Sequence, residues 1–349
     1  MNWFKDNIVE MEAYVPGEQP KGDAPVVKLN TNENPYPPSP AVADVLHHFD
    51  TACLRRYPDA MAGEFRRAAS EALGVPTDWI LPGDGSDDLI MMIARACLGK
   101  GRAVAYPVPT FDFYFTQAQI QDAPRIELPL EPDSFRLPLD AMRSAGAAVT
   151  FVANPNSPTG VAATTDELDS LASDLDGLLV VDEAYADFAS ENAMSLVEKH
   201  ENVIVLRTLS KGYSLAGLRL GFAIAQPTVL AGLLKTKSIY NVGWLPCAAG
   251  AAAMRDQDYK NVNARNVVAT RRRLVDELEQ MGWSVLPSET NFILASPPGG
   301  AGGIAAELKE RNILVRYYDR PRLRDSMRIT VGTDEETDLL LNELRNLQA

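Results

Sequence analysis

The sequence predicts an α/β protein in which a large domain, built on a mainly parallel and doubly wound sheet, is joined to a smaller α/β domain. Three observations lead to this prediction. The chain has 349 residues, enough for about two domains that each bury a core. Short apolar strands centred near residues 80, 103, 126, 150, 180 and 205 alternate with helical patterns. A long helix at 265–281 then leads into a second α/β pattern.

The predicted domain boundaries follow from where these patterns change. Residues 36–260 form the large domain, residues 261–349 the small domain, and residues 1–35 a segment that packs with the small domain. In the small domain we expect strands within 283–288, 291–296, 313–318 and 326–333, a helix at 304–311 and a flexible loop at 297–303. A capping box from Thr333 to Glu336 opens a closing helix.

Charge and composition exclude several classes of partner. A net charge of −14 argues against a nucleic-acid or anionic-membrane partner, because phosphates are repelled over most of such a surface. The first residues are acidic where a signal peptide needs an apolar run, and no stretch approaches a membrane span, so the cytoplasm is the expected location. Three cysteines without a CxxC spacing indicate reduced thiols, and neither they nor the three histidines predict a metal site.

The stretch TLSKGYSLAGLRLGF, at 208–222, is the centre of the functional prediction. It follows an apolar, β-branched run typical of a buried parallel strand, and ligands of open α/β sheets bind beyond the carboxyl ends of strands. Arg219 suits a phosphate dianion, and Thr208 and Ser210 add hydroxyl groups. In this setting Lys211 suits an amine that holds an aldehyde cofactor, pyridoxal 5′-phosphate. The alternative for Lys211 alone is a solvated lysine at a strand end.

A glycine turn offers a second phosphate-binding element. Gly83 and Gly85 predict a tight turn, and Ser86 is expected to be the N-cap of the helix that follows. A helix N-terminus exposes backbone N–H groups and the positive end of the helix dipole, so it can hold a phosphate. Phe111, just past the strand at 102–106, can stack on a flat heteroaromatic ring or pack in the core.

Carboxylates end the apolar run at 177–181. Asp182 closes a buried strand, where a charge is costly without a partner. A protonated pyridine nitrogen would be such a partner, and an ionised Asp182 would keep the ring an electron sink. Tyr185 is placed to donate to a ring oxygen. The alternative for Asp182 is a cap of the next helix.

One arginine of the C-terminal region stands out. Arg328 lies inside an alternating apolar strand, and burying a guanidinium calls for an anion, which we interpret as a substrate carboxylate or phosphate. No G-x-G-x-x-G motif follows the first strand, which disfavours a nicotinamide enzyme.

These motifs together resemble the histidinol-phosphate aminotransferase branch of the fold-type I pyridoxal phosphate enzymes. The similarity runs nearly from end to end. It consists, in the family's order, of NENP, RYPD, GDGSDD, PNSPTG, DEAY, TLSKGYSLAGLRLGF, NFIL and MRITVGT. Each motif alone is weak, and the combination is specific.

The resemblance implies a role for each matching residue. Lys211 would hold the cofactor and shuttle a proton, Asp182 would pair with the pyridine nitrogen, and Tyr185 would donate to the ring oxygen. The residues implied at the phosphate are Gly85, Ser86, Asp87, Thr208, Ser210 and Arg219. Tyr57 would reach the phosphate from the neighbouring subunit, which implies a homodimer with composite sites. The residues implied on the substrate side are Tyr14, Asn34 and Arg328.

The chain departs from the family pattern at several positions. The family usually has Asn before the Pro-Thr-Gly turn, where this chain has Ser157 preceded by Asn156, so either residue is a candidate for the ring oxygen. Phe111 stands where a Tyr commonly stacks on the ring, and Asp88 replaces the usual Glu. The run PYPPSP follows Asn34, where a glycine is common.

The expected activity is amino transfer between L-histidinol phosphate, or a similar amine, and 2-oxoglutarate. An aromatic amino acid aminotransferase is the main alternative, because phenylalanine also presents a flat ring and an anion. A decarboxylase of phosphorylated amino acids fits NENP and RYPD less well. A cofactor-binding regulator without turnover is disfavoured, because neither a helix-turn-helix extension nor a basic patch accompanies the motifs. The sequence does not rank the amino donors.

Overall fold

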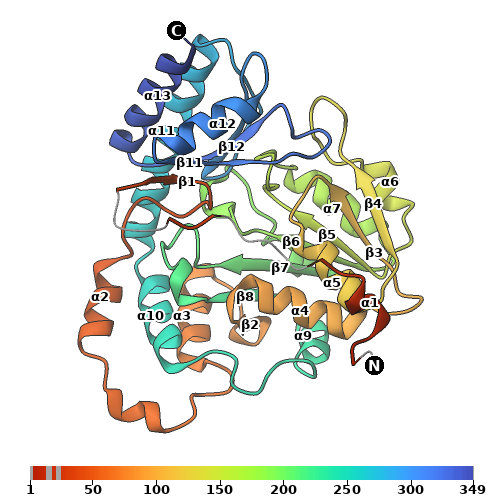
Figure 1. The fold of residues 1–349 in the computed structure, drawn as a ribbon. Coiled ribbons are helices and arrows are strands. Elements are labelled where there is room, and N and C mark those ends of the chain that lie inside the picture. Colours follow the sequence, from red (N-terminus) through yellow and green to blue (C-terminus); the bar gives the residue numbers. More distant parts are fainter. Residues whose placement is uncertain (1–2, 13–17, 21–24, 349) are drawn as a thin grey trace.

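A seven-stranded sheet forms the centre of the larger part of the computed structural model (Figure 1), which describes residues 3–12, 18–20 and 25–348. In spatial order the strands are β2 (Ile80–Gly83), β8 (Gly221–Ile224), β7 (Val203–Thr208), β6 (Leu178–Asp182), β5 (Val149–Ala153), β3 (Val104–Val108) and β4 (Arg125–Pro129). β8 runs antiparallel to both neighbours, and the five strands from β7 to β4 are parallel. The predicted mainly parallel sheet is confirmed, and each predicted strand is found.

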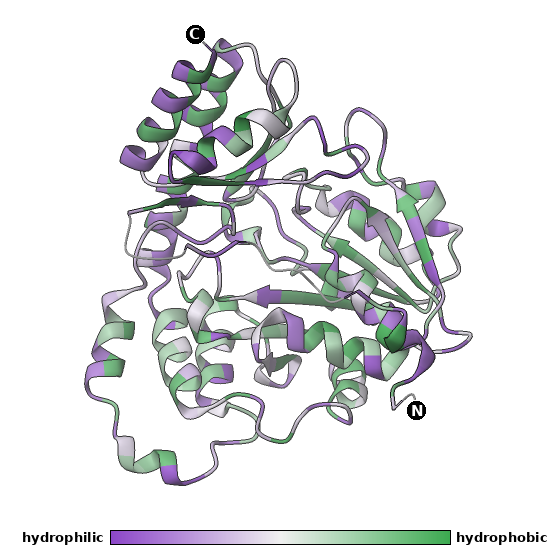
Figure 2. Cartoon of the chain, viewed as in Figure 1, coloured by the Kyte–Doolittle hydropathy of each residue, from purple (hydrophilic) through white to green (hydrophobic). Residues whose placement is uncertain are grey.

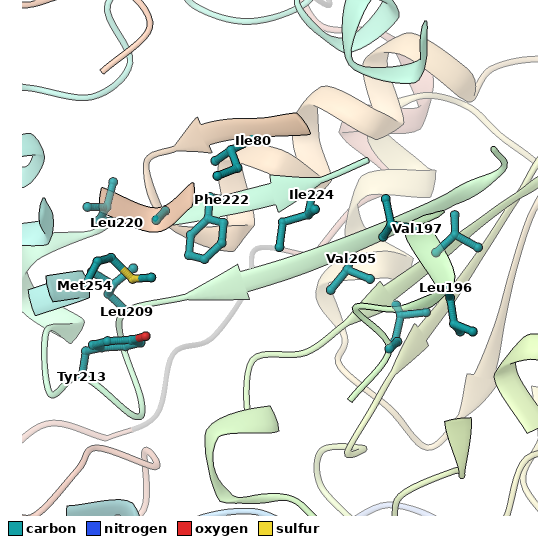
Figure 3. Packing of buried hydrophobic residues seen from close by; sticks show 14 of the residues in the cluster. Ile80, Leu196, Val197, Val205, Leu209, Tyr213, Leu220, Phe222, Ile224 and Met254 are labelled. Carbon is teal, nitrogen blue, oxygen red and sulfur yellow. The ribbon is translucent and has the colours of Figure 1, made fainter. Parts of the chain in front are cut away.

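Helices cover both faces of this sheet, because its strands are apolar at successive positions. Along β7, Val203 and Val205 belong to one core cluster, while Ile204 and Leu206 belong to the cluster on the opposite face. Figure 3 shows the first cluster around Val205. The helices of this part are α2 (Pro40–His47), α3 (Gly63–Leu73), α4 (Gly85–Cys97), α5 (Phe113–Ile120), α6 (Leu139–Arg143), α7 (Thr165–Asp174), α8 (Leu196–Lys199), α9 (Pro227–Leu233) and α10 (Trp244–Arg255). Short 3₁₀ helices are η1 (Thr51–Arg55), η2 (Thr77–Trp79), η3 (Ala186–Phe188) and η4 (Ala216–Leu218).

A second, five-stranded sheet forms the smaller part. Its order is β1 (Val27–Leu29), β11 (Ile313–Tyr317), β12 (Met327–Thr330), β10 (Phe292–Ser296) and β9 (Ser284–Val285). The helices α11 (Gln257–Gln280), α12 (Ala301–Glu310) and α13 (Asp334–Gln348) share a core with this sheet. Figure 2 shows both hydrophilic and hydrophobic turns on α11 and α13, as expected of helices with one buried face. The predicted capping box is present, because the Thr333 and Glu336 side chains bond each other's backbone N–H groups.

The N-terminal segment contacts both parts. β1 pairs in parallel with β11 in the small sheet. The short helix α1 (Asp6–Val9) instead lies against α5, where Asn7 Nδ2 donates to the carbonyl of Gln119 at 2.7 Å. The predicted domain boundary at 260/261 falls inside α11, so the division into domains stays a prediction.

Three element boundaries differ from the prediction. α11 begins at Gln257 because the Asp256 side chain accepts a bond from the backbone of Tyr259 and caps the helix. α12 begins at Ala301, inside the expected loop, because Ala301 is fully buried in the core of the small part. Ser86 is not an N-cap: α4 starts at Gly85, whose φ of +76° completes the turn one residue earlier.

Two further findings concern the chain as a whole. Cys53, Cys97 and Cys247 are free thiols, as predicted, and only Cys247 is fully buried. Across the part of the chain that the structure describes, none of the helices has the length and apolar composition that crossing a bilayer requires.

The contact between β8 and the start of α4 predicts a sensitive glycine. A Cβ on Gly221 would lie 2.7 Å from backbone atoms of Gly85 and Ser86, so Gly221→Ala must push the helix off the strand. We expect the free energy of unfolding, measured by urea denaturation, to fall by about 1–3 kcal/mol. Gly232→Ala in α9 is the control, because nothing lies within 4 Å of its added Cβ. Equal stability of the two variants would contradict the close packing.

Candidate active site

Most of the predicted cofactor-binding residues line one cavity of about 200 Å³. It lies at the carboxyl ends of the central strands, where β5, β6 and β7 end at Ala153, Asp182 and Thr208. The lining residues are Ser86, Asp87, Phe111, Ala153, Pro155, Ser157, Asp182, Ala184, Tyr185, Thr208, Ser210, Lys211, Ala216 and Arg219. Most of the residues predicted at the cofactor are among them.

Lys211 is a partly buried amine with a lowered pKa. Its Nζ donates to the carbonyl of Thr31 at 3.2 Å and lies 5.9 Å from the centre of the Tyr185 ring. Removal from water and the nearby charge of Arg328 together lower the pKa of Lys211 to about 8, against the opposing effect of Glu33. A larger fraction of this amine is therefore neutral near pH 7 than for an exposed lysine.

Asp182 is buried, and neutral groups hold its carboxylate. Oδ2 accepts a bond of 2.7 Å from the Tyr114 hydroxyl, and Oδ1 accepts one of 3.2 Å from the backbone N–H of Ala184. Burial raises the pKa of Asp182 to about 6, although the bond from Tyr114 opposes the shift. A cation in the cavity would offset the cost of ionising this carboxyl group.

Tyr114 links Asp182 to the predicted stacking residue. Its ring is fully buried and stacks on Phe151, with centroids 4.7 Å apart. The edge of Phe111 meets the same ring, at 5.7 Å and 87°. The sequence analysis did not single out Tyr114, because only the fold brings its hydroxyl to residue 182.

Tyr185 receives a bond from a residue that the sequence analysis did not single out. Asn32 Nδ2 donates to the Tyr185 hydroxyl at 2.8 Å. Asn32 has a φ of +58°, and its backbone N–H donates to Thr330 Oγ1 in the small sheet. Burial raises the pKa of Tyr185, and the charge of Arg328 opposes that rise. The motif NENP was the available signal, and it did not distinguish Asn32 from Asn34.

The start of α4 and Arg219 form a cradle at one side of the cavity. Arg219 Nη2 pairs with Asp87 at 3.1 Å, and an added Cβ on Gly85 would lie 2.5 Å from the same nitrogen. Only glycine at position 85 therefore lets the guanidinium approach the helix terminus, whose first N–H groups have no partners within the helix. Ser86, Thr208 and Ser210 line the cavity beside this cradle.

The side chains of Asn156 and Ser157, the two candidates for the cofactor ring oxygen, differ in their contacts. Ser157 lines the cavity, and its hydroxyl accepts a bond of 3.2 Å from Arg328. Asn156 does not line it: its amide donates to the Pro109 carbonyl and to Thr159, and its oxygen accepts from Thr110. The geometry favours Ser157 over Asn156 as the residue near the cofactor, because the turn itself uses the hydrogen-bonding groups of the Asn156 side chain.

The remaining predicted residues lie outside the cavity lining. Asn34 Nδ2 donates to the carbonyls of Lys211 and Gly212, at 3.0 and 3.3 Å, so it holds the turn that carries Lys211. Tyr57 is 78% exposed and stacks on Tyr240. Tyr14 lies outside the described residues.

Arg328 points away from the small core and toward the large sheet. Its neighbours Met327 and Ile329 are buried under the helices, so the pleat turns Arg328 to the other face. Its Nη2 donates to the carbonyl of Asn30 at 2.8 Å, and its buried Nε has no hydrogen-bond partner among the described residues. Its cross-strand partner is Arg316, and both guanidinium groups lie near the Tyr318 ring, at 5.8 and 5.2 Å.

A lysine, a buried carboxylate, an aromatic face and an anion cradle around one cavity define a class of enzyme that binds a phosphorylated aromatic aldehyde. Residues 24–344 match the family described as aminotransferase class I and II. The chain belongs to this family and is a transaminase.

Individual relatives agree with this assignment. The chain is 50% identical over 347 residues to histidinol-phosphate aminotransferase 1 of Trichormus variabilis, covering 99% of both chains. It is 43% identical over 348 residues to histidinol-phosphate aminotransferase of Geobacter sulfurreducens, again covering 99% of both. Its fold is similar to the structure of the Sinorhizobium meliloti histidinol-phosphate aminotransferase in complex with pyridoxal 5′-phosphate, with a TM-score of 0.89, 25% identity and coverage of 98% and 96%.

The cofactor of this transaminase is pyridoxal 5′-phosphate, and the residues of the cavity fit it. The cradle that a Cβ on Gly85 would fill suits the phosphate, since it combines a helix terminus with a guanidinium and hydroxyl groups. Asp182 suits a protonated ring nitrogen, and Lys211 suits the aldehyde. No other lysine lines the cavity among the described residues.

The lowered pKa of Lys211 predicts how aldehyde capture depends on pH. The folded chain lowers this pKa from 10.5 to about 8, so the neutral, nucleophilic amine accumulates as the pH rises through about 8. We expect the rate of capture by the cofactor-free protein, followed by stopped-flow absorbance, to rise between about pH 7 and 9 and then level off. A rate that keeps rising toward pH 10.5 would show an ordinary, exposed lysine.

Proposed function

We propose that this transaminase moves an amino group between L-histidinol phosphate and 2-oxoglutarate, a step of histidine biosynthesis. The observation that carries the proposal is the pair Arg316 and Arg328, which are cross-strand partners and for which no carboxylate partner is found in the described chain. Arg328 also donates to Ser157 in the cavity lining. Two neighbouring cations without a counter-ion repel each other, so binding of an anion between them is favourable. A phosphate monoester offers nearly two charges to them, and the relatives named above are histidinol-phosphate aminotransferases.

The bound cofactor supplies a covalent anchor for the amine and an electron sink. Lys211 Nζ would hold the cofactor aldehyde and would take the proton from the substrate α-carbon. Asp182 would pair in its ionised form with the ring nitrogen, and the Tyr114 hydroxyl holds its carboxylate in place. Tyr185 would donate to the ring oxygen, and its hydroxyl is oriented by Asn32.

The anionic groups of cofactor and substrate are bound by separate parts of the chain. Arg219, Ser86, Thr208 and Ser210 belong to the large part and take the cofactor phosphate. Arg328 belongs to the small part and meets the large part at Ser157, and it takes the substrate anion. The carboxylate of glutamate and the phosphate of histidinol phosphate would then bind the same guanidinium, each in its own half-reaction.

Substrate preference tests the role of the arginine pair. We expect histidinol phosphate to discharge the cofactor's visible band faster than histidinol, phenylalanine or tyrosine. Arg316→Met should reduce the preference for histidinol phosphate over histidinol about tenfold or more, because a charge-assisted contact to the phosphate is lost. Arg345→Met, which removes an exposed arginine paired with Glu277, is the control. If phenylalanine reacts faster than histidinol phosphate, the chain is an aromatic amino acid aminotransferase.

We also propose that the active enzyme is a homodimer in which Tyr57 reaches the cofactor phosphate of the partner. Tyr57 is 78% exposed and stacks on Tyr240, which is 43% exposed. Leu46, Leu54 and Ile239 are further exposed apolar residues, each between 48% and 69% exposed. A second copy packed on Tyr57 and Tyr240 would remove their rings from water. Free cysteines support a reducing compartment, and we propose the cytoplasm.

Mixing two defective variants tests the composite site. Lys211→Ala removes the reactive amine, and Tyr57→Ala weakens phosphate binding in the partner's site. If Tyr57 acts across the interface, a mixed dimer has one site with both defects and one intact site. We expect the mixture, refolded together at limiting cofactor, to be more active than the sum of the separate variants. Activity equal to that sum would place Tyr57 in its own subunit's site or outside any site.

A further inference from the structure

A buried cluster of four charged side chains contacts the turn at Lys211 and Gly212, called the lysine turn below. Its members are Glu183, Asp187, Arg207 and Lys260, with side chains between 0% and 13% exposed. Arg207 Nε is 2.9 Å from Glu183 Oε2, and Lys260 Nζ donates to Asp187 Oδ1 at 3.1 Å. Arg207 Nη1 lies 3.8 Å from the same Asp187 oxygen. The cluster has no net charge, so its ions offset one another's cost of burial.

Asp187 is the member that touches the turn. An added Cβ on Gly212 would lie 2.2 Å from Asp187 Oδ2 and 2.6 Å from Asp187 Cβ. The other Asp187 oxygen is held by Lys260 and Arg207, so the carboxylate has no freedom to rotate away. Gly212 therefore rests against a side chain that two cations fix from behind.

The same turn is also held by the N-terminal segment. Asn34 donates to the carbonyls of Lys211 and Gly212, as described above. The backbone that carries Lys211 thus lies between a carboxamide from the N-terminal segment and a carboxylate from η3. Lys260, in the first turns of α11, ties this arrangement to the helix that leads into the small part.

We propose that Asp187 is a positioning residue for Lys211: its carboxylate, fixed between Arg207 and Lys260, sets the place of the Gly212 turn and with it the reach of the lysine amine into the cavity. The inference rests on the proposed role of Lys211 as the amine that captures the cofactor. It assigns a function to the buried cluster, whose members do not line the cavity. A small displacement of a reacting group lowers its rate far more than it lowers binding of the rest of the ligand.

Two ligands distinguish a change in the position of Lys211 from general damage to the cofactor site. Pyridoxal phosphate is captured by Lys211, whereas pyridoxamine phosphate has the same ring and phosphate but no aldehyde, so it binds without using the lysine. The full-length, cofactor-free protein is mixed with each ligand. Stopped-flow absorbance gives the rate of capture, and calorimetry gives the Kd for pyridoxamine phosphate.

Two variants disturb the contact from its two sides. Asp187→Asn keeps the shape but removes the negative charge that Lys260 and Arg207 hold, so the side chain is fixed less firmly against Gly212. Gly212→Ala inserts a methyl group where Asp187 leaves no room. In both we expect capture to slow about tenfold or more, while the Kd for pyridoxamine phosphate stays within about twofold of the wild type.

Matched controls lie nearby and on the surface. Gly217→Ala adds a methyl group to the same loop with nothing within 4 Å, and Asp174→Asn removes a half-exposed carboxylate paired with Arg143. Both should behave as the wild type. A wild-type capture rate in either test variant, or a loss of pyridoxamine phosphate affinity in proportion to the loss of capture, would overturn the inference. A wild-type protein that captures no aldehyde would instead overturn the proposed role of Lys211.

Discussion

The active site is organised around two ionisable side chains, Asp182 and Lys211, that line one cavity. Neither Asp182 nor Lys211 forms a salt bridge with any part of the chain that the structure describes. Burial moves both toward their neutral forms, with a pKa of about 6 for Asp182 and about 8 for Lys211. Such groups destabilise a cofactor-free chain and become favourable when a ring cation and an aldehyde arrive. The site is thus arranged around a ligand with both features.

Each of the two sheets places residues at or next to the cavity. The carboxyl edge of the large sheet carries Asp182 and Lys211, and the open face of the small sheet carries Arg328. Asn32 connects them, because its side chain bonds Tyr185 while its backbone bonds the small sheet. Contacts between the two parts therefore act directly on Tyr185, which lines the cavity.

The sequence was sufficient for the fold and for the residues whose chemistry is local. Apolar runs predicted the strands, and a run that ends in a polar residue predicted Asp182 and Lys211 at the carboxyl edge. What it missed was contact between distant segments. Tyr114 is 68 positions from Asp182 and Asn32 is 153 from Tyr185, so no spacing rule pairs them. Asn156 stayed a candidate beside Ser157, because composition does not reveal that the turn uses the Asn156 amide.

The most direct test of the central claim is to locate the covalent bond between protein and cofactor. The cofactor-loaded protein is reduced with borohydride, digested, and mapped by peptide mass spectrometry. The account predicts that the added mass is found on the peptide containing Lys211, at that lysine and at no other. Attachment at a different lysine, or no attachment, would contradict it.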